Sequence, residues 1–238
     1  MQDNLIHWHE SLDSTMREAA RLASLGHPHG TAVVADEQTA GQGRHGHVWH
    51  SEKGSGLYVS VILRLAVQSA DLPVLTLALG LSAAEAIHKD CGFSCDLRWP
   101  NDVLINGRKC CGILTQLHGT AAVAGIGINV NHSRFPSDLQ PIATSLRIAG
   151  GREYDRHGLL KTLLDSINIH CEILQHRGPR DIIHLFSRAS SYVHGRRVRI
   201  EDTGDCGTTD GLDPSGFLIL KKDDGHRITI YAGGVRPE

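Results

Sequence analysis

The dipeptide Asn106-Gly107 constrains the fold more than any other feature, because it stands between two apolar runs. Val103 to Ile105 precede the dipeptide, and Lys109 to Leu117 follow it. Asn-Gly between such runs is the strongest short-range signal for a β-hairpin, since both residues accept the left-handed backbone of a tight turn. The pattern therefore predicts two antiparallel strands joined at this turn.

Further strands and helices are predicted on either side of the hairpin. Three apolar runs predict strands, at 31–35, 57–65 and 121–128. Three stretches predict helices: one capped by Ser14 or Thr15 and ending at Gly26, one over 72–88, and one over 160–174. A mixture of this kind indicates an α+β fold.

The pattern changes after about Ser190. Short predicted strands at 198–200, 217–220 and 228–231 alternate with turns rich in glycine and aspartate. Short strands with such turns are typical of a small β-barrel. We therefore expect two domains, an α+β domain over residues 1–190 and a small barrel over 191–238.

Charge and hydropathy exclude two classes of partner. The formal net charge is -2, so the chain lacks the overall basic field that duplex nucleic acid attracts. No run of eighteen apolar residues is present, and Met1 to Asn4 contain an acid instead of a basic signal region. We expect a cytoplasmic protein that binds neither DNA nor a membrane.

The six cysteines form no C-x-x-C pair, and the sixteen histidines show no H-x-x-x-H spacing. We therefore expect reduced, mostly buried thiols and mostly exposed histidines, with neither a zinc site nor a disulfide. Three of the histidines, His45, His47 and His50, lie in one loop.

That loop runs from Glu37 to Gly56 and contains five glycines. Glycines let a backbone fold closely around anionic oxygens, and Arg44 adds a fixed positive charge. Trp49 follows in the same loop. The alternative is a flexible surface loop without a ligand.

The second group of residues consists of the segment Arg98-Trp-Pro-Asn-Asp102 and Lys109. The predicted hairpin returns Lys109 toward this segment, which gathers one aromatic ring, one carboxylate and two cations. A solvated hairpin with a stabilising Asp102–Lys109 pair is the alternative.

A third group is the strand from Gly125 to Asn131. Asn129 in this strand could bind the edge of adenine or an amide, or make only turn hydrogen bonds.

Taken in order, Ser14-Thr15, GQGRHGHVW, RWPND, RKCCGIL and GIGINVN resemble the motifs of the biotin protein ligases. The resemblance covers nearly the whole chain. It implies the family's class II synthetase-like mixed sheet with packed helices, followed by an SH3-like C-terminal domain. Because Ser14 lies so near the start, the chain resembles the short monofunctional type without an N-terminal DNA-binding domain.

The resemblance implies a two-step reaction in which ATP activates biotin and a lysine of a carrier protein accepts it. The implied co-substrate and ion are ATP and Mg²⁺, with no tightly bound cofactor. The implied partner is the biotin carboxyl carrier domain of a biotin-dependent carboxylase, and a homodimer is left open.

The same resemblance implies roles for individual residues. Lys109 and Arg44 would be catalytic, and Asp102 would help to place Mg²⁺. The implied ATP site comprises Arg44, His47, Trp49 and Asn129. The implied biotin site comprises Ser14, Thr15, Met16, Gln38, Gly41, Gln42, Gly43, Arg44 and Lys109.

Three of these positions depart from the family's pattern. Met16 stands where the family usually has asparagine, and Gln42 and His47 replace arginines. An imidazole that is mostly neutral is a poorer phosphate ligand than a guanidinium.

Two other functions are compatible with parts of this pattern. Lipoate ligases and the lipoyl or octanoyl transferases share the fold and use a comparable lysine. The RWPND segment and the G-x-G-R-x-G loop argue against them. A non-catalytic binding module would not need Lys109.

Overall fold

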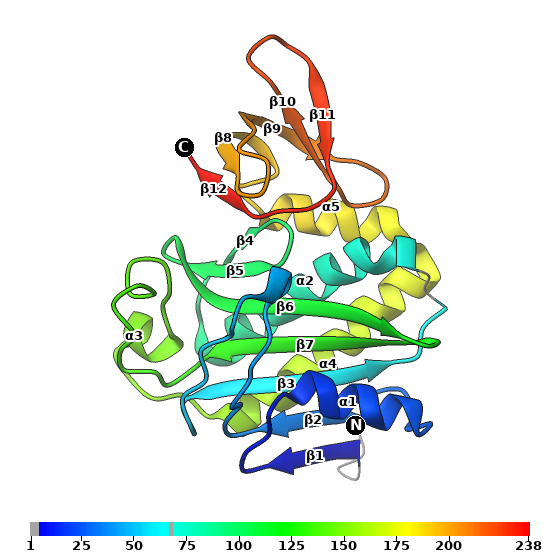
Figure 1. Cartoon of the computed structure of the whole chain (residues 1–238), viewed down its shortest axis with the longest axis vertical. Helices are drawn as coiled ribbons and strands as arrows, with labels where there is room; N and C mark the ends of the chain where they lie inside the picture. Colours follow the sequence, from blue (N-terminus) through cyan, green and yellow to red (C-terminus); the bar gives the residue numbers. More distant parts are fainter. Residues whose placement is uncertain (1–4, 67–68) are drawn as a thin grey trace.

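The computed structural model describes residues 5–66 and 69–238, and its main part is a mixed seven-stranded sheet (Figure 1). The strand order is β1-β2-β3-β7-β6-β5-β4, and only the β1–β2 pair is parallel. The strands are β1 (Ile6–His9), β2 (Ala32–Ala35), β3 (Gly56–Leu63), β4 (Asp96–Arg98), β5 (Asp102–Ile105), β6 (Arg108–His118) and β7 (Ala121–Asn129).

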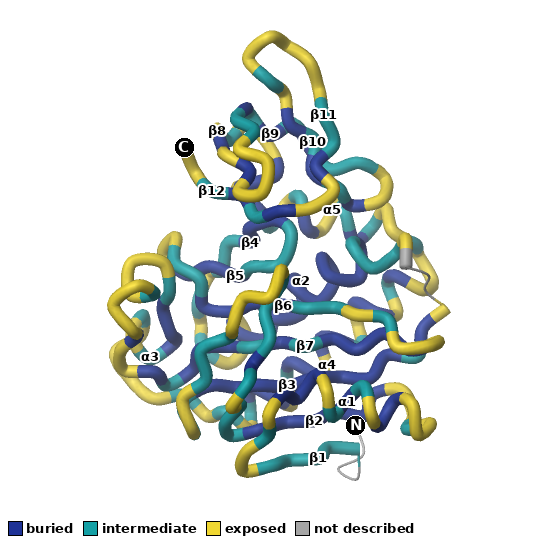
Figure 2. Tube along the Cα trace, in the orientation of Figure 1, coloured by how far each residue is buried: buried dark blue, intermediate teal, exposed yellow. Residues whose placement is uncertain are grey.

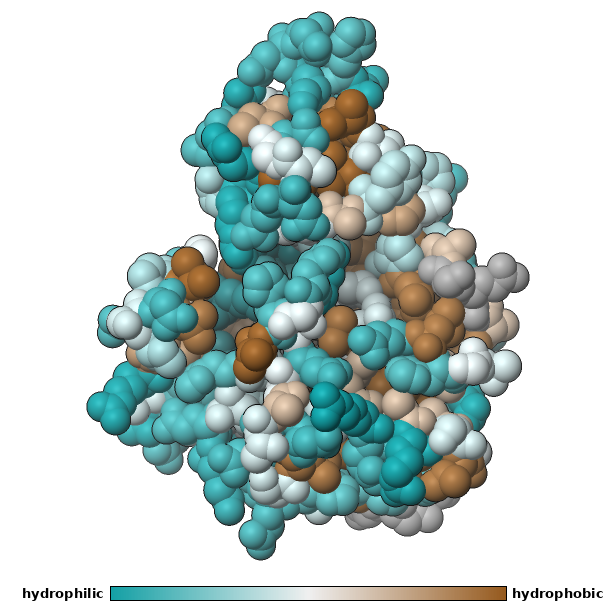
Figure 3. Space-filling view, in the orientation of Figure 1, coloured by the Kyte–Doolittle hydropathy of each residue, from teal (hydrophilic) through white to brown (hydrophobic). Residues whose placement is uncertain are grey.

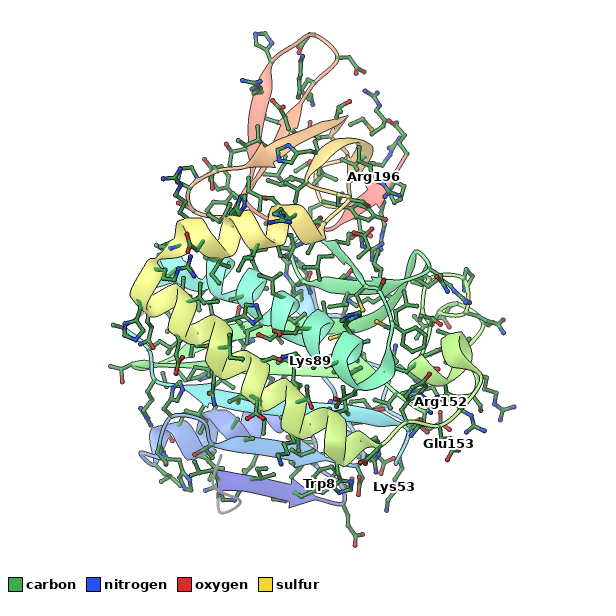
Figure 4. All side chains as sticks on the ribbon, turned by 180° about the vertical axis from the view of Figure 1, so that it is seen from behind. Trp8, Lys53, Lys89, Arg152, Glu153 and Arg196 are labelled. Carbon is green, nitrogen blue, oxygen red and sulfur yellow. The ribbon has the colours of Figure 1, made fainter. Side chains whose placement is uncertain are left out.

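Helices cover both faces of this sheet. They are α1 (Thr15–Ser24), α2 (Leu72–Cys91), α3 (Leu146–Gly150), α4 (Arg156–Arg177) and α5 (Pro179–Ala189), with 3-10 turns η2 (Arg44–Gly46) and η3 (Ser69–Asp71). Helix α1 lies on the face seen in Figure 1, and α2, α4 and α5 lie behind, as Figure 4 shows. In Figure 4, Trp8 of β1 marks the lower edge of the sheet.

Side chains of the central strands alternate between two cores. Val33 and Ile62 pack with the apolar side of α1, whereas Ala32, Val34 and Val61 belong to the larger core that α2 and α4 cover. This period of two is what a strand buried on both faces requires. Figure 2 shows the result, with β3 buried along its length and β7 buried over most of it. The central position predicted for 57–65 is confirmed.

The predicted hairpin is confirmed. Asn106 and Gly107 have φ angles of 51° and 75°, the left-handed pair that a two-residue turn needs. Across this turn β5 pairs with β6, with an irregularity between Val103 and Leu104 that places Leu104 opposite Lys109. The hairpin therefore places Lys109 next to β5, and its side chain reaches Asp102 at the start of that strand.

The C-terminal part is a separate antiparallel sheet, consistent with the predicted SH3-like domain. Its strands are β8 (His194–Ile200), β9 (Cys206–Leu212), β10 (Leu218–Lys221), β11 (Arg227–Ile230) and β12 (Val235–Pro237). They form a five-stranded antiparallel sheet in the order β11-β10-β9-β8-β12, and no closed barrel is found within the described residues. β9 escaped prediction because its inward positions are Gly207, Thr209 and Gly211 instead of apolar side chains.

Four other helices and strands were not predicted from the sequence. They are β1, α3, α5 and β12. β1 and β12, of four and three residues, are edge strands of the two sheets, so they carry little periodic signal. The domain boundary expected at residue 190 falls between the end of α5 and the start of β8.

Several smaller findings complete the description. All six cysteines are free, and three of them are buried. No described helix is both long and apolar enough to cross a bilayer. Apolar side chains on the face in Figure 3 are scattered among hydrophilic ones. Residues 1–4, which carried the prediction about a signal region, lie outside the described residues.

Trp99 joins the two sheets. Its side chain is 3% exposed, and its indole Nε1 donates a hydrogen bond to the carbonyl of Gly216 at 2.9 Å. Gly216 precedes β10 and lies against Val74 of α2. The contact therefore fixes the C-terminal sheet to the larger one.

We expect Trp99→Phe to lower the free energy of unfolding by about 1–3 kcal/mol, because the buried carbonyl of Gly216 loses its donor. Urea unfolding measures the change, and Tyr231→Phe, at a residue that is 70% exposed, is the control. Equal stability of Trp99→Phe and the control would show that this hydrogen bond does not stabilise the junction.

Candidate active site

A pocket opens beside β6 and β7. The glycine loop, the start of α1 and the segment before β5 also contribute to its wall. Its lining residues are Thr15, Met16, Gln38, Gln42, Gly43, Arg44, Trp49, Val59, Asn101, Lys109, Gly112, Ile113, Leu114, Gly125, Ile126 and Gly127.

One end of the pocket carries a network of small polar groups. The Oε1 of Gln38 accepts hydrogen bonds from the amide of Thr15 at 2.9 Å and from its hydroxyl at 3.1 Å. The buried hydroxyl of Ser60 donates to Thr15 Oγ1 at 2.8 Å. The Ser14 hydroxyl is buried and has no partner among the described residues, although Ser14 itself lies at the N-cap position of α1. An unpaired buried hydroxyl is costly, so this end is suited to a ligand with both donors and acceptors.

A buried carboxylate positions Lys109. Asp102 Oδ1 lies 2.5 Å from Lys109 Nζ, and Asp102 Oδ2 accepts a hydrogen bond from Arg98 Nη2 at 2.6 Å. Burial by itself raises the pKa of Asp102, but the neighbouring Lys109 and Arg98 outweigh burial and hold that pKa below its usual range. Two cations around one carboxylate leave a net positive charge at the pocket wall.

Trp49 lies flat against the strands beside Lys109. A Cβ on Gly112 or on Gly127 would come within 2.7 Å and 2.6 Å of its ring, so the indole needs both glycines. Lys109 Nζ lies 5.5 Å from the ring centroid, within cation–π range. The indole Nε1 is buried and has no partner among the described residues.

Arg44 connects three parts of the chain. Its Nη1 donates to Asn101 Oδ1 at 3.1 Å and to the carbonyl of Gly233 at 3.4 Å. Burial lowers the pKa of Arg44, and Asp102 opposes this effect. The side chain therefore links the glycine loop to the segment before β5 and to the C-terminal sheet.

Residues 8–133 match the profile of the biotin/lipoate A/B protein ligase family, and residues 193–235 match that of the biotin protein ligase C-terminal domain. A relative from Bacillus subtilis, named bifunctional ligase/repressor BirA, is 38% identical over 236 residues, which cover 96% of this chain and 72% of the relative. The chain belongs to the biotin/lipoate A/B protein ligase family. The resemblance to biotin protein ligases is thereby confirmed.

Two further family members are informative. A biotin--[acetyl-CoA-carboxylase] ligase of Mycobacterium tuberculosis is 33% identical over 226 residues, which cover 90% of this chain and 81% of the relative. A structure of the Aquifex aeolicus biotin protein ligase in complex with biotin and ATP superposes with a TM-score of 0.88. It is 31% identical, and the match covers 98% of this chain and 99% of that one. The predicted fold class is thus confirmed, apart from closure of the barrel.

The pocket gathers eight of the residues that the family resemblance singled out. These are Thr15, Met16, Gln38, Gln42, Gly43, Arg44, Trp49 and Lys109. The others lie just outside the lining: Ser14, Gly41, His47, Asp102 and Asn129. Asn129 donates to the carbonyl of Thr144 at 3.1 Å, and His47 is exposed. Their predicted contacts with the nucleotide remain predictions.

The structure differs from the sequence-based predictions in two features of the site. The aromatic ring expected among the cations was Trp99, but Trp99 points to Gly216, and Trp49 is the ring beside Lys109. Asn101 was not singled out, although it lines the pocket and binds Arg44. Its place in the RWPND motif was the available signal.

The predicted Mg²⁺ role of Asp102 does not fit this geometry. Both of its carboxylate oxygens face cations of the protein, and its side chain is only 14% exposed. A magnesium ligand needs a free oxygen facing the ion and its water. We therefore assign Asp102 the role of positioning Lys109, and not that of a metal ligand.

We expect Asp102→Asn to lower the free energy of unfolding by about 3 kcal/mol at pH 7, because two largely buried cations lose their counter-charge. The folded-state pKa of Asp102 is depressed, so its stabilisation is present above about pH 4 and is lost as the pH falls through the folded pKa.

The difference between the native chain and Asp102→Asn should therefore shrink as the pH falls below about 4. Urea unfolding over a pH series measures this difference, and Asp165→Asn, at an exposed position, is the control. A difference that stays constant down to pH 3 would contradict the assigned pairing.

Proposed function

We propose that this chain is an ATP-dependent biotin–protein ligase that forms biotinyl-5′-AMP and transfers biotin to a lysine of a biotin carboxyl carrier protein. The observation that carries the proposal is one pocket that has a small polar network at one end. Its wall also contains Trp49 and Lys109, and Asp102 holds Lys109 in position. The relatives reported above are named as ligases, and two of them as biotin ligases.

The Thr15–Gln38 end suits the ureido head of biotin, which offers two N–H donors and one carbonyl acceptor. Thr15 Oγ1 can accept or donate, and the unpaired Ser14 hydroxyl supplies another polar group nearby. Met16 approaches Gly125 closely, and this apolar part of the wall suits the rings of biotin.

Lys109 is placed for the first chemical step. An oxygen of the biotin carboxylate forms a bond to the α-phosphorus of ATP, and the bond from that phosphorus to the pyrophosphate oxygen breaks. Both partners are anionic, so the charge of Lys109 offsets their repulsion and stabilises the charge that develops on the phosphate. Asp102 keeps the ammonium group in position before the substrates arrive.

The second step is acyl transfer to the carrier protein. The acceptor amine attacks the acyl carbon of biotinyl-AMP, the acyl–phosphate bond breaks, AMP leaves and the amine loses a proton. The enzyme needs no nucleophile of its own here. It has to retain the adenylate and exclude water until the acceptor arrives, and Arg44 and the glycine loop are placed to do so.

Biotin and lipoate can be distinguished directly, because ATP–pyrophosphate exchange reports the first step for either acid. We expect exchange with biotin and none above background with lipoate or octanoate. With a biotin carboxyl carrier domain present, the carrier should gain the mass of one biotinyl group. Faster exchange with lipoate than with biotin would overturn the proposal.

We expect Lys109→Ala to slow biotinyl-adenylate formation by roughly 10²–10³-fold, the usual cost of losing one charge-stabilising donor. Transfer from synthetic biotinyl-adenylate should be less affected, since its acyl–phosphate bond is already formed. Single-turnover assays of the two half-reactions measure both effects. Equal losses in the two steps would contradict an adenylation role for Lys109.

We expect Arg44→Gly to release biotinyl-adenylate, because the loop loses its contacts with Asn101 and Gly233. Free adenylate would then biotinylate lysines of a bystander protein, detected by mass spectrometry. Arg152→Gly, at an exposed residue just after the end of α3, serves as the control. If Arg44→Gly modifies only the carrier lysine, Arg44 does not retain the adenylate.

A further inference from the structure

Two histidines and a glutamate lie close together at the C-terminal end of the glycine loop. They are His50, Glu52 and His132, and one potential ligand atom from each lies within 4.8 Å of the others. His50 and Glu52 follow Trp49, where the loop returns to the sheet, and His132 follows the end of β7. The two segments are held side by side by a hydrogen bond of 2.6 Å from the amide of Asn131 to the carbonyl of Ser55.

His132 is the most constrained member of this group. It is fully buried, its ring stacks on Phe135 at 5.2 Å, and its Nε2 lies 3.2 Å from the hydroxyl of Tyr58. Its Nδ1 is buried and has no hydrogen-bond partner among the described residues. Burial, and next to it the proximity of His50, lowers the pKa of His132 to about 4, so its imidazole is neutral at pH 7.

The other two members can adjust. Glu52 is exposed and His50 is half-buried, with its ring centroid 5.9 Å from that of His132. Bonds of about 2.0–2.2 Å to a tetrahedral ion require ligand atoms roughly 3.4 Å apart, so the group has to contract modestly. The exposed glutamate side chain can make this movement without disturbing the core.

The chemistry of the three groups selects the class of ion. Two imidazoles and one carboxylate suit zinc, whereas Mg²⁺ and Ca²⁺ prefer oxygen ligands throughout. Three protein ligands also leave a fourth position for water, as in zinc sites that are not closed. An unpaired buried imidazole nitrogen is costly, and a metal would satisfy it.

We propose that His50, Glu52 and His132 form a Zn²⁺ site at the point where the glycine loop joins the sheet. The ion would tie the segment after Trp49 to the segment after β7, and so restrain the end of the loop that carries the indole. The inference rests on these three residues and does not depend on the proposed function.

The test is Zn²⁺ binding by isothermal titration calorimetry to the full-length, tag-free chain after treatment with chelator. We expect one site per chain, and His50→Ala and Glu52→Gln should each weaken it by at least about tenfold, as losing a ligand should cost no less than losing a second-shell partner. Both changes lie at positions that are not buried, so the fold should persist, and far-ultraviolet circular dichroism checks this. His176→Ala, at an exposed histidine on α4, is the matched control and should bind Zn²⁺ like the native chain.

Anomalous diffraction at the zinc edge locates the ion independently of affinity. We expect a single strong peak between His50 and His132. Affinity that is unchanged in both loop variants, or a peak at other histidines only, would overturn the proposal. Because biotin-dependent pyrophosphate exchange is measured separately, failure of the zinc site and failure of the proposed function give different results.

Discussion

The ion pair between Asp102 and Lys109, shared with Arg98, is the interaction on which the rest of the site depends. Three charged side chains are brought together where water is largely excluded. Losing one partner of such a buried ion pair strongly destabilises the folded protein. The arrangement exists because Asn106 and Gly107 turn the chain and set Lys109 opposite Leu104 of β5, from where its side chain reaches Asp102. Local turn chemistry thus fixes the position of a charge that an anionic ligand can use.

The loop over this charge is held by few but specific contacts. Trp49 fits only because Gly112 and Gly127 lack side chains, and Arg44 reaches both Asn101 and the C-terminal sheet. Glycines make ordering such a loop entropically costly. Contacts with a ligand, and with any ion bound at the end of the loop, therefore contribute directly to holding the loop closed over the pocket. The C-terminal sheet takes part in the site through Gly233 and is anchored through Trp99.

Sequence alone predicted the parts of the fold that have strong local signals. The hairpin, the central strand over 57–65 and the long helix α4 follow from turn chemistry and apolar spacing. The small C-terminal β domain was also predicted, although closure of its barrel is not seen in the described residues. β9 was missed because its buried positions are small or polar. The contact of Trp99 with Gly216 and the approach of His132 to His50 join residues 117 and 82 apart in the chain. No local pattern could indicate them, since tertiary packing creates both.

Asp102 is placed to act on catalysis by holding Lys109. A double-mutant cycle in ATP–pyrophosphate exchange tests it most directly, with Asp102→Asn, Lys109→Ala and the double variant compared at saturating biotin and ATP. If Asp102 works through Lys109, the double variant should be no slower than Lys109→Ala alone, so the two losses are strongly non-additive. Losses that multiply in the double variant would show that the two residues act independently, and would contradict this account.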